Sequence, residues 1–245
     1  MRCSKWKVVV GATVLSALSA LAPVRAQAVL EPLAGADAGS PAPWHVVGLP
    51  GQTKPFTQFT VVEHDGRRAL RIEADSSYGN LVHPLTPTLA AGHLAWQWRV
   101  DLPLAGTDLR QRSGDDTEVK VCVLFDEPMD KLSFTDRQLI RLARARSADA
   151  VPTATLCYVW DPHLPAGTTL DNAYTRRLRY IVVESGSAKL GRWVAERRDL
   201  RADFLRAFGA ECEVVPPVIG VAVGADADNT RGHSIADVSQ LVLEP

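Results

Sequence analysis

Carboxylate side chains gather at two places in this sequence where an extended segment begins or ends. Asp115 and Asp116 come directly before one such segment, and Asp226 and Asp228 follow the apolar run 217–224. Carboxylates at the entrance of a strand can bind a cation or accept hydrogen bonds from sugar hydroxyls. Asp side chains also bond to their own backbone in turns. The sequence therefore allows two interpretations of Asp115 and Asp116, a ligand-binding pair and a loop-forming pair.

The second cluster has a spacing that is similar to a calcium-binding loop. Oxygen-bearing side chains alternate at Asp226, Asp228 and Thr230, and Asp237 supplies a carboxylate at the twelfth position. Arg231 stands where such loops require glycine, and the last ligand is Asp rather than the usual bidentate Glu. The segment predicts either a Ca²⁺ site made by Asp226, Asp228 and Asp237 or a polar hairpin in which Asp226 and Asp228 cap turns.

Three aromatic residues stand near strand ends or turns, namely Trp160, Tyr174 and Trp193. A planar ring at the rim of a β-sandwich can stack on the apolar face of a sugar ring. We therefore predict a ligand-binding set of Asp115, Asp116, Trp160 and Tyr174. The alternative for each ring is packing at the edge of a sheet.

Standard enzyme motifs are missing from the sequence. It contains no G-x-S-x-G, no H-E-x-x-H and no glycine-rich phosphate loop. A glycosidase needs two carboxyl groups about 5–10 Å apart. Asp115, Asp116 and Glu118 are the candidates for its acid and base, and sequence alone does not say which of them meet.

The elements that position these residues are extended segments. In residues 93–102 (HLAWQWRVDL), Leu94, Trp96 and Trp98 alternate with polar residues, which is typical of a strand buried on one face. Asp65 and Gly66 form a turn signal between two other strands. The remaining expected strands are 59–64, 69–74, 80–83, 118–125, 154–160, 179–184, 192–196, 217–224 and 236–243. About ten strands separated by turns predict a mostly β fold, a β-sandwich or jelly roll.

Two segments have helical periodicity. Residues 134–145 place Phe134, Leu139 and Leu142 near one stripe, opposite several arginines, and predict a surface helix. Residues 200–208 predict a second short helix, capped by Asp199 and ended by a glycine in the left-handed conformation. An arginine-rich helix face can meet an anion or a membrane surface, but the narrow apolar stripe favours a solvated face.

The first residues have the layout of a secretory signal peptide. Basic residues precede an apolar run from Val8 to about Ala22, and small residues near Ala26 suit a signal peptidase. The run is too short for a good membrane span, which needs about 20 residues. We expect a signal peptide over 1–26, a flexible lead-in over 27–43 and a single β-sandwich domain over 44–245. The mature protein is then periplasmic or secreted, with no transmembrane segment.

Charge and cysteine content limit the partners and the chemistry. Cleavage after Ala26 would remove four basic residues and no acidic one, leaving 23 basic and 28 acidic side chains and a net charge of −5. A mildly acidic chain without a basic cluster argues against nucleic acid as a partner. Cys122 and Cys157 lie in apolar strands and form either a disulfide or two buried thiols. The sequence favours the thiols.

A set of motifs gives the chain a family resemblance. They are, in order, WQWRV, SGDDTEVKVCVLFD, TLCYVWD, NAYTRRLRYIVVESG, GRWVAERRDLRADFLRAFG and PPVIGVAVGADADNTRGHSIADVSQL. In this order they resemble the bacterial exported proteins grouped as domain of unknown function 3047. The resemblance covers the chain from about Trp44 to its end and implies an exported β-sandwich, without implying an activity. The long arginine-rich segment between Asp126 and Thr155 departs from the family pattern.

These observations favour a binding module for a glycan or another small polar ligand. They rest on the expected sandwich, the export signal, the Asp-rich loops and the rim aromatics. One alternative is an envelope enzyme that acts on a polysaccharide with paired carboxylates. Another is a non-catalytic assembly partner of the cell envelope that docks through the arginine-rich helix.

Overall fold

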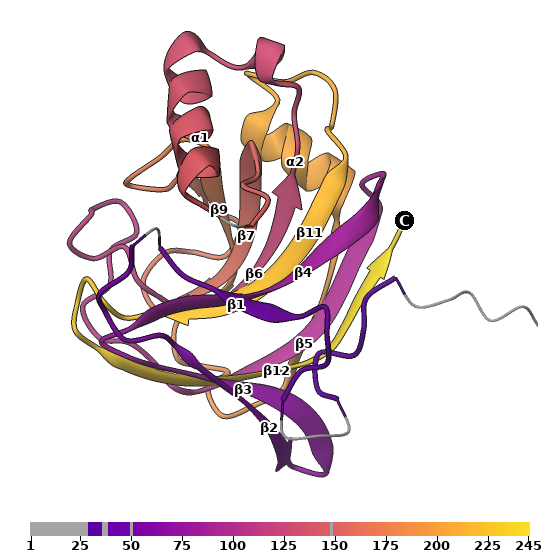
Figure 1. Cartoon of the computed structure of the whole chain (residues 1–245). Helices are drawn as coiled ribbons and strands as arrows, with labels where there is room; N and C mark the ends of the chain where they lie inside the picture. Colours follow the sequence, from indigo (N-terminus) through magenta and orange to yellow (C-terminus); the bar gives the residue numbers. More distant parts are fainter. Residues whose placement is uncertain (1–28, 36–38, 50, 148) are drawn as a thin grey trace, which may run out of the picture.

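The computed structural model describes residues 29–35, 39–49, 51–147 and 149–245, and the expected signal peptide lies outside them. These residues form a sandwich of two β-sheets, as the sequence predicts (Figure 1). In strand order, the larger sheet has β1 (His45–Val47), β4 (Tyr78–Leu89), β11 (Val218–Asp226), β6 (Thr117–Phe125), β7 (Ala154–Asp161), β9 (Leu178–Ser185) and β8 (Thr169–Asp171). The smaller sheet has β10 (Val194–Asp199), β5 (His93–Leu102), β12 (His233–Glu244), β3 (Arg67–Asp75) and β2 (Gln58–His64).

The chain passes repeatedly from one sheet to the other, so many neighbouring strands are distant in sequence, although β2 and β3, β6 and β7, and β8 and β9 are consecutive. Strands β3 to β6 alternate between the sheets, as do β9 to β12. Neighbours pair antiparallel except β7 and β9, which run parallel. Each of the ten predicted strands is present, and the structure adds the short strands β1 and β8. The turn at Asp65 and Gly66 has positive φ at both residues, as a tight hairpin requires.

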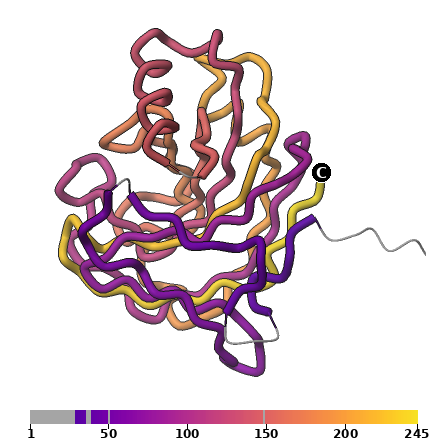
Figure 2. The backbone as a smooth tube through the Cα atoms, in the orientation of Figure 1, coloured from indigo at the N-terminus to yellow at the C-terminus, as the bar shows by residue number. Residues whose placement is uncertain are grey.

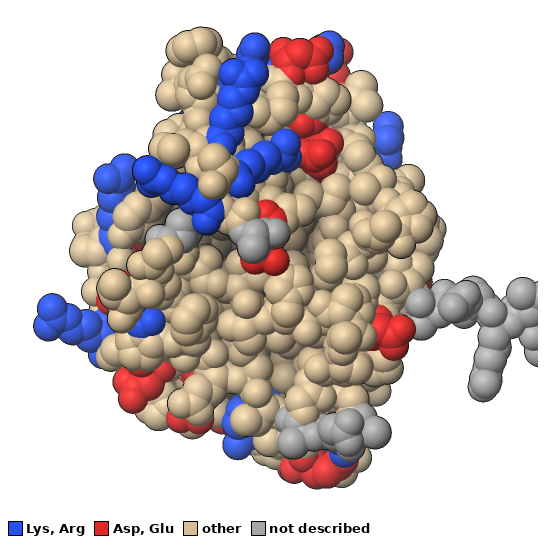
Figure 3. Space-filling view, in the orientation of Figure 1, with Lys and Arg blue, Asp and Glu red and all other residues tan. Residues whose placement is uncertain are grey.

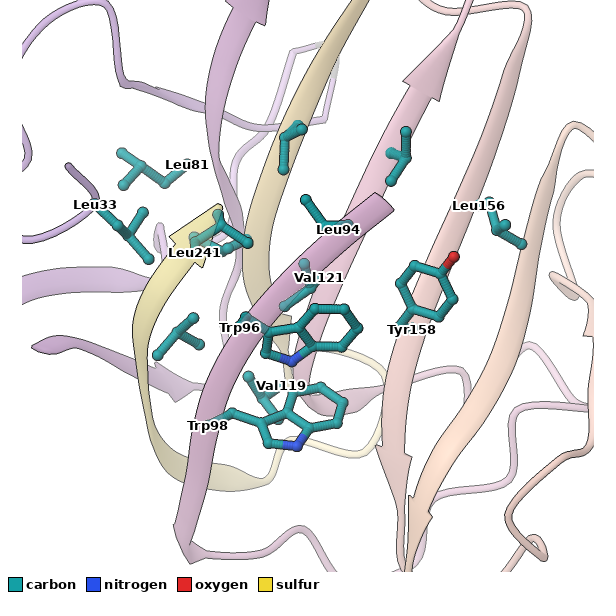
Figure 4. Packing of buried hydrophobic residues seen from close by; sticks show 14 of the residues in the cluster. Leu33, Leu81, Leu94, Trp96, Trp98, Val119, Val121, Leu156, Tyr158 and Leu241 are labelled. Carbon is teal, nitrogen blue, oxygen red and sulfur yellow. The ribbon is translucent and has the colours of Figure 1, made fainter. Parts of the chain in front are cut away.

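Aromatic side chains fill the space between the sheets. Trp96 and Trp98 point inward from β5 and are almost fully buried. Tyr158 meets them from β7, with its ring centroid 5.2 Å from that of Trp96 (Figure 4). Aromatic pairs at this separation stabilise a core beyond the area that they bury. The larger sheet therefore packs one face against this core, and its other face points away from it.

Two α-helices accompany the sheets in the described residues. Helix α1 (Phe134–Arg146) is capped by Ser133, whose hydroxyl accepts from the Asp136 backbone at 3.1 Å. It stands over the outer face of the larger sheet (Figure 1). A short 3-10 turn, η1 (Met129–Lys131), precedes it. Its expected apolar stripe is exposed instead, and Ile140 is the side chain that it buries.

Helix α2 (Leu200–Phe208) has the predicted bounds and the predicted cap, Asp199. It is more than a surface helix, because Phe204 reaches into the core and lies 4.7 Å from the ring of Phe125. Gly209 ends the helix with φ of −60°, so the left-handed conformation expected of that glycine does not form.

The segment before Trp44 packs against the sandwich, which corrects the expectation of a flexible lead-in for its described part. Leu30 and Leu33 are buried in the main core, and the Glu31 carbonyl accepts from the Trp44 indole at 2.9 Å. Figure 2 shows this segment continuing into β1, which pairs with β4 at the edge of the larger sheet. In the described residues, no helix is long and apolar enough to cross a membrane.

Candidate functional site

The outer face of the larger sheet carries a row of side chains that crosses five strands. Val82, Ala222, Cys122, Cys157 and Tyr180 lie in register on β4, β11, β6, β7 and β9. Residues in register share one face of a sheet, and most of this row belongs to a second apolar cluster, separate from the main core. The row forms the floor of a cleft.

Two members of this row are joined covalently. Cys122 and Cys157 form a disulfide, with their Cα atoms 4.0 Å apart. This corrects the sequence interpretation, which favoured two buried thiols. The pairing register of β6 and β7 brings the two residues directly opposite each other, and sequence does not reveal a register. Among the described cysteines, Cys212 is free.

A buried ion pair lies on the same face, toward the end of β11. The Lys120 ammonium is 2.9 Å from the Asp226 carboxylate, and both side chains are more than nine-tenths buried. Asp226 also accepts from the Thr117 backbone at 2.8 Å and from its hydroxyl. Burial lowers the pKa of Lys120, but Asp226 and Tyr78 outweigh it, so the pKa stays above its usual value and the ammonium keeps its charge.

Asp115 faces this pair from the loop before β6. Its carboxylate accepts from the Tyr180 hydroxyl at 3.1 Å and from the Asn172 amide. Burial, and then repulsion by Asp226, raise the pKa of Asp115 to about 6. A carboxyl group with this pKa exchanges a proton near neutral pH, so it can donate as well as accept a hydrogen bond.

Asp116 has a different role, although it is the next residue. It accepts four hydrogen bonds, from the backbone and side chains of Asn229 and Thr230, at 2.6–3.1 Å. Its side chain is buried and lines neither cavity described below. Asp116 therefore joins the β11–β12 loop to the loop before β6, and this contact brings the two Asp clusters of the sequence together.

Tyr174 stands at the rim of the cleft. About half of its side chain is exposed, and its hydroxyl lies 2.9 Å from the Asn229 side-chain oxygen and 3.0 Å from the Arg112 carbonyl, either of which can accept its proton. The Arg112 guanidinium lies 5.2 Å from the ring centroid, so it covers part of the ring. The remaining ring surface is available to a ligand.

The cleft contains two adjoining cavities. The polar cavity, of about 370 Å³, is lined by the ion pair, Asp115 and Tyr174, together with Leu49, Lys54, Tyr78, Asn172, Thr175, Leu178, Tyr180, Asp228 and Asn229. The apolar cavity, of about 320 Å³, lies over the disulfide and under α1. The two share Leu49, Tyr78, Lys120 and Leu178. Both volumes fall within the range of roughly 300–1,000 Å³ that is usual for small-molecule sites.

The structure unites part of the ligand-binding set that the sequence predicts. Asp115 and Tyr174 line the polar cavity, but Trp160 does not. Trp160 is buried between the sheets, with its indole donating to the Gly186 carbonyl at 3.0 Å and its ring 6.0 Å from Trp98. Strand alternation accounts for this, because Trp160 shares the inward face of β7 with Tyr158.

The carboxylates expected to bind Ca²⁺ are placed apart. Asp226 is paired with Lys120 and Asp228 with Lys54, while Asp237 lies on β12 in the other sheet, 2.9 Å from Arg71. Each carboxylate already has a cationic partner, so the three offer no common point for an ion.

In the described residues, the group with a metal-ligand arrangement is His64, Asp101 and Asp237. Arg71 contacts both of its carboxylates, and the Arg99 guanidinium adds an ion pair to Asp101 at 2.6 Å. These guanidinium groups already supply the positive charge that a metal ion would bring, so this group is an ion-pair network.

Sequence reasoning missed Lys120, Tyr78, Asn172 and Tyr180. A signal existed for Lys120, since a lysine between valines inside a buried strand calls for a counter-charge. No comparable signal marks Asn172 or the tyrosines, because their position in the cleft depends on how the strands pair.

Fold and site together define a β-sandwich protein with a cleft on the outer face of one sheet. The chain belongs to the family described as Protein of unknown function (DUF3047), which it matches over residues 42–242. This confirms the family resemblance found in the motifs. A comparison with curated proteins finds no match.

Several solved structures are similar to the chain at low sequence identity. A family 29 carbohydrate binding module is 11% identical, with 89% of this chain and 90% of that chain covered and a TM-score of 0.35. The family 12 xyloglucanase from Bacillus licheniformis is 8% identical, with 82% and 100% covered and a TM-score of 0.43. Endoglucanase 3 from Trichoderma harzianum is 8% identical, with 84% and 99% covered and a TM-score of 0.39.

Proposed function

We propose that this protein binds a glycan or another small polar ligand in the cleft on the outer face of the larger sheet. The observation that carries the proposal is the polar cavity, in which charged, amide and phenolic groups from distant parts of the chain converge. A concave site with a few convergent polar groups is the usual form of a small-molecule site.

The chemistry of the cavity suits hydroxyl groups. Asn172, Asn229 and Tyr174 line it with amide and phenol groups, which are donor and acceptor types that pair with sugar hydroxyls. They bond to one another and to Asp115 in the free protein, so a sugar hydroxyl would exchange with these bonds. The exposed part of the Tyr174 ring offers a surface on which a sugar ring can stack.

Binding is tested by thermal unfolding of the mature protein with a panel of glycans. A ligand that binds only the folded state adds about 2.7 kcal/mol at 100 times its Kd, which raises the Tm by roughly 5–10 °C for a domain of this size. Tyr174→Ala should weaken binding by about three- to tenfold, the value of a lost aromatic contact.

The matched control for Tyr174→Ala is Phe134→Ala. Phe134 is also an exposed aromatic residue, but it lies on α1 and lines neither cavity. The Phe134→Ala variant should bind the glycan as tightly as the native protein does. Equal binding by both variants, or no shift with any glycan, would remove the support for this site.

One observation favours a second function, a polysaccharide-acting enzyme. Asp115 and Asp226 line the same cavity, and the pKa of Asp115, raised by burial to about 6, suits a general acid near neutral pH. A measurement of glycan turnover distinguishes the two functions. An enzyme would release new reducing ends from a bound glycan, and Asp115→Asn would abolish release while keeping binding. A binding module would release none.

We further propose that the protein is exported to the periplasm or the medium. The Cys122–Cys157 disulfide supports this, since such bonds persist in oxidising compartments. Expression of the full chain followed by N-terminal sequencing should find a mature protein that begins at Gln27. An uncleaved chain retained in the cytoplasm would contradict export.

A further inference from the structure

The apolar cavity is lined in a way that a sugar alone does not explain. Its floor is the disulfide with Val82 and Ala222, and its walls add aliphatic side chains such as Leu124. Apart from Tyr78, which it shares with the polar cavity, no aromatic ring lines it. Sugar rings pack best on planar rings, whereas branched aliphatic walls suit hydrocarbon.

The cover of this cavity is apolar for the most part, although Asn80, Ser147 and Asp149 also line the cavity. Ala143 of α1 and the segment from Ala150 to Pro152 lie over one side, and Val47 and Leu49 close the other. A third cavity, of about 270 Å³, continues under α1 past Ile140. It shares Ala143, Val151, Pro152, Thr155 and Leu178 with the apolar cavity, so the apolar space continues under α1.

The polar cavity adjoins this apolar space directly. Leu49, Tyr78, Lys120 and Leu178 line both, so a single ligand can occupy both without leaving the cleft. The Lys120 Nζ atom is held by Asp226 and lies 5.0 Å from the Tyr78 ring centroid. The boundary between polar and apolar surface therefore falls at this ion pair.

Charges within the polar cavity nearly cancel. Lys120 is paired with Asp226 and Lys54 with Asp228, which leaves Asp115 as the remaining ionisable carboxyl group. Two lysines then face three carboxyl groups, so the cavity disfavours a phosphate or another anionic head group. It fits a head group that is uncharged and rich in hydroxyls.

We propose that the ligand of this cleft is an amphiphile, with an uncharged polyhydroxylated head in the polar cavity and an aliphatic chain in the apolar cavity over the Cys122–Cys157 disulfide. The inference rests on the proposed function for the head group and adds the aliphatic chain. The single cleft then recognises a sugar by its attachment to hydrocarbon, as in a glycolipid.

The test is a chain-length series measured by calorimetry on the mature protein. Maltose and the hexyl, octyl and decyl maltosides are compared below their micelle concentrations. Each methylene that enters the cavity should lower Kd by about fourfold until the cavity is filled. 1-Decanol, which has the chain but no sugar, should bind more weakly than decyl maltoside.

A pair of variants shows whether the chain enters the apolar cavity. Ala143→Trp fills it from α1 and should abolish the dependence on chain length while maltose still binds. Ala145→Trp, on an exposed position of the same helix, adds the same ring outside the cleft and should leave the dependence unchanged. This control separates entry into the cleft from adsorption of detergent elsewhere.

The outcomes separate the inference from the function on which it rests. If maltose binds but Kd is the same for every chain length, the aliphatic site is refuted and the glycan site stands. If 1-decanol and decyl maltoside bind equally, the glycan head is refuted and the aliphatic site stands. A chain-length dependence that survives Ala143→Trp also overturns the inference, because the chain then binds elsewhere.

Discussion

The outer faces of the two sheets differ in their side chains and in what covers them. The outer face of the larger sheet is apolar over its middle strands and is covered by α1 and the segment around β1. The outer face of the smaller sheet carries charged side chains that pair across its strands, including Arg71 with Asp237 and His233 with Glu73. The covered face encloses cavities, whereas most charged side chains of the other face are partly exposed, with Asp237 buried beneath Arg71 and His64.

The comparison shows what distinguishes the cleft from a solvated surface in this protein. Ion pairs occur on both faces, so charge alone marks neither. Lys120 and Asp226 are more than nine-tenths buried, while His233 and Glu73 are about two-fifths exposed. On the larger sheet, Leu49 of the segment after β1 lines the cleft beside this ion pair, and the Tyr78 ring of β4 lies 5.0 Å from the Lys120 Nζ atom. Helix α1 and the segment around β1 cover the cleft.

Basic side chains gather around α1 on the face shown in Figure 3, whereas much of the surface below the helix is uncharged. Arg141, Arg144 and Arg146 of α1 are exposed, and Arg144 donates to Asp126 at 2.7 Å. Arg137 is partly buried and donates to the Leu132 carbonyl at 3.1 Å. The helix therefore presents charge to water and a small apolar face to the cleft, which suits a cover rather than a core element.

Removing one partner of the buried ion pair should have the largest effect. Lys120→Met leaves Asp226 buried without its counter-charge and should lower the free energy of unfolding by about 3–5 kcal/mol. Arg197→Met breaks a half-exposed pair with Glu244 on the smaller sheet and should cost less than about 1 kcal/mol. Urea unfolding measures both.

A second change checks the cause of that loss. Lys120→Met combined with Asp226→Asn removes both charges, so the double variant should be more stable than Lys120→Met alone. If Lys120→Met lowers the free energy of unfolding no more than Arg197→Met does, the difference in burial between the two ion pairs does not change their contribution to stability.

The titration of Asp115 in the cleft should change the free energy of unfolding with pH, by less than the loss expected for Lys120→Met. The folded-state pKa of Asp115, raised by burial from 3.8 to about 6, means that the folded protein holds this proton to higher pH than the unfolded chain does. Its contribution to stability is present below the unfolded pKa of about 4 and is lost as the pH rises to about 6. The slope is at most about 1 kcal/mol per pH unit.

Asp115→Asn removes this titration. The free energy of unfolding of the variant should therefore fall less between pH 4 and 6 than that of the native protein. Asp130→Asn changes an exposed carboxylate outside the cleft and should keep the native slope. The difference between the curves isolates Asp115 from other buried carboxyl groups, such as Glu118, whose pKa burial raises to about 8. Parallel curves for Asp115→Asn and the native protein would contradict the assignment.

Much of this fold could be predicted from the sequence, because most of its strands are long enough to show periodicity. The missed strands, His45–Val47 and Thr169–Asp171, have three residues each, too few for alternation to be seen. Helix α2 was predicted at its observed bounds because a capping Asp and a final Gly mark its ends.

The site was less accessible to sequence reasoning, since it depends on pairing between distant segments. Asp116 and Thr230 are 114 positions apart, and no local pattern joins them. Cys122 lies opposite Cys157 only through the register of β6 and β7. The position of Trp160 could be predicted from the sequence, because strand alternation places it with Tyr158 on the inward face.

The smallest expected effect lies on the outward side of α1, the helix that covers the cleft. Leu142 is about half exposed, and the structure shows no core contact for its side chain, so Leu142→Ser should change the free energy of unfolding by no more than about 0.5 kcal/mol. Ile140 lies two positions earlier and is buried toward the sheet, so Ile140→Ala should cost about 2 kcal/mol or more. Urea unfolding of the two variants compares the two sides of one helix. If both lose the same stability, α1 is not a one-sided cover, and the contrast between the faces of the sandwich would need another cause.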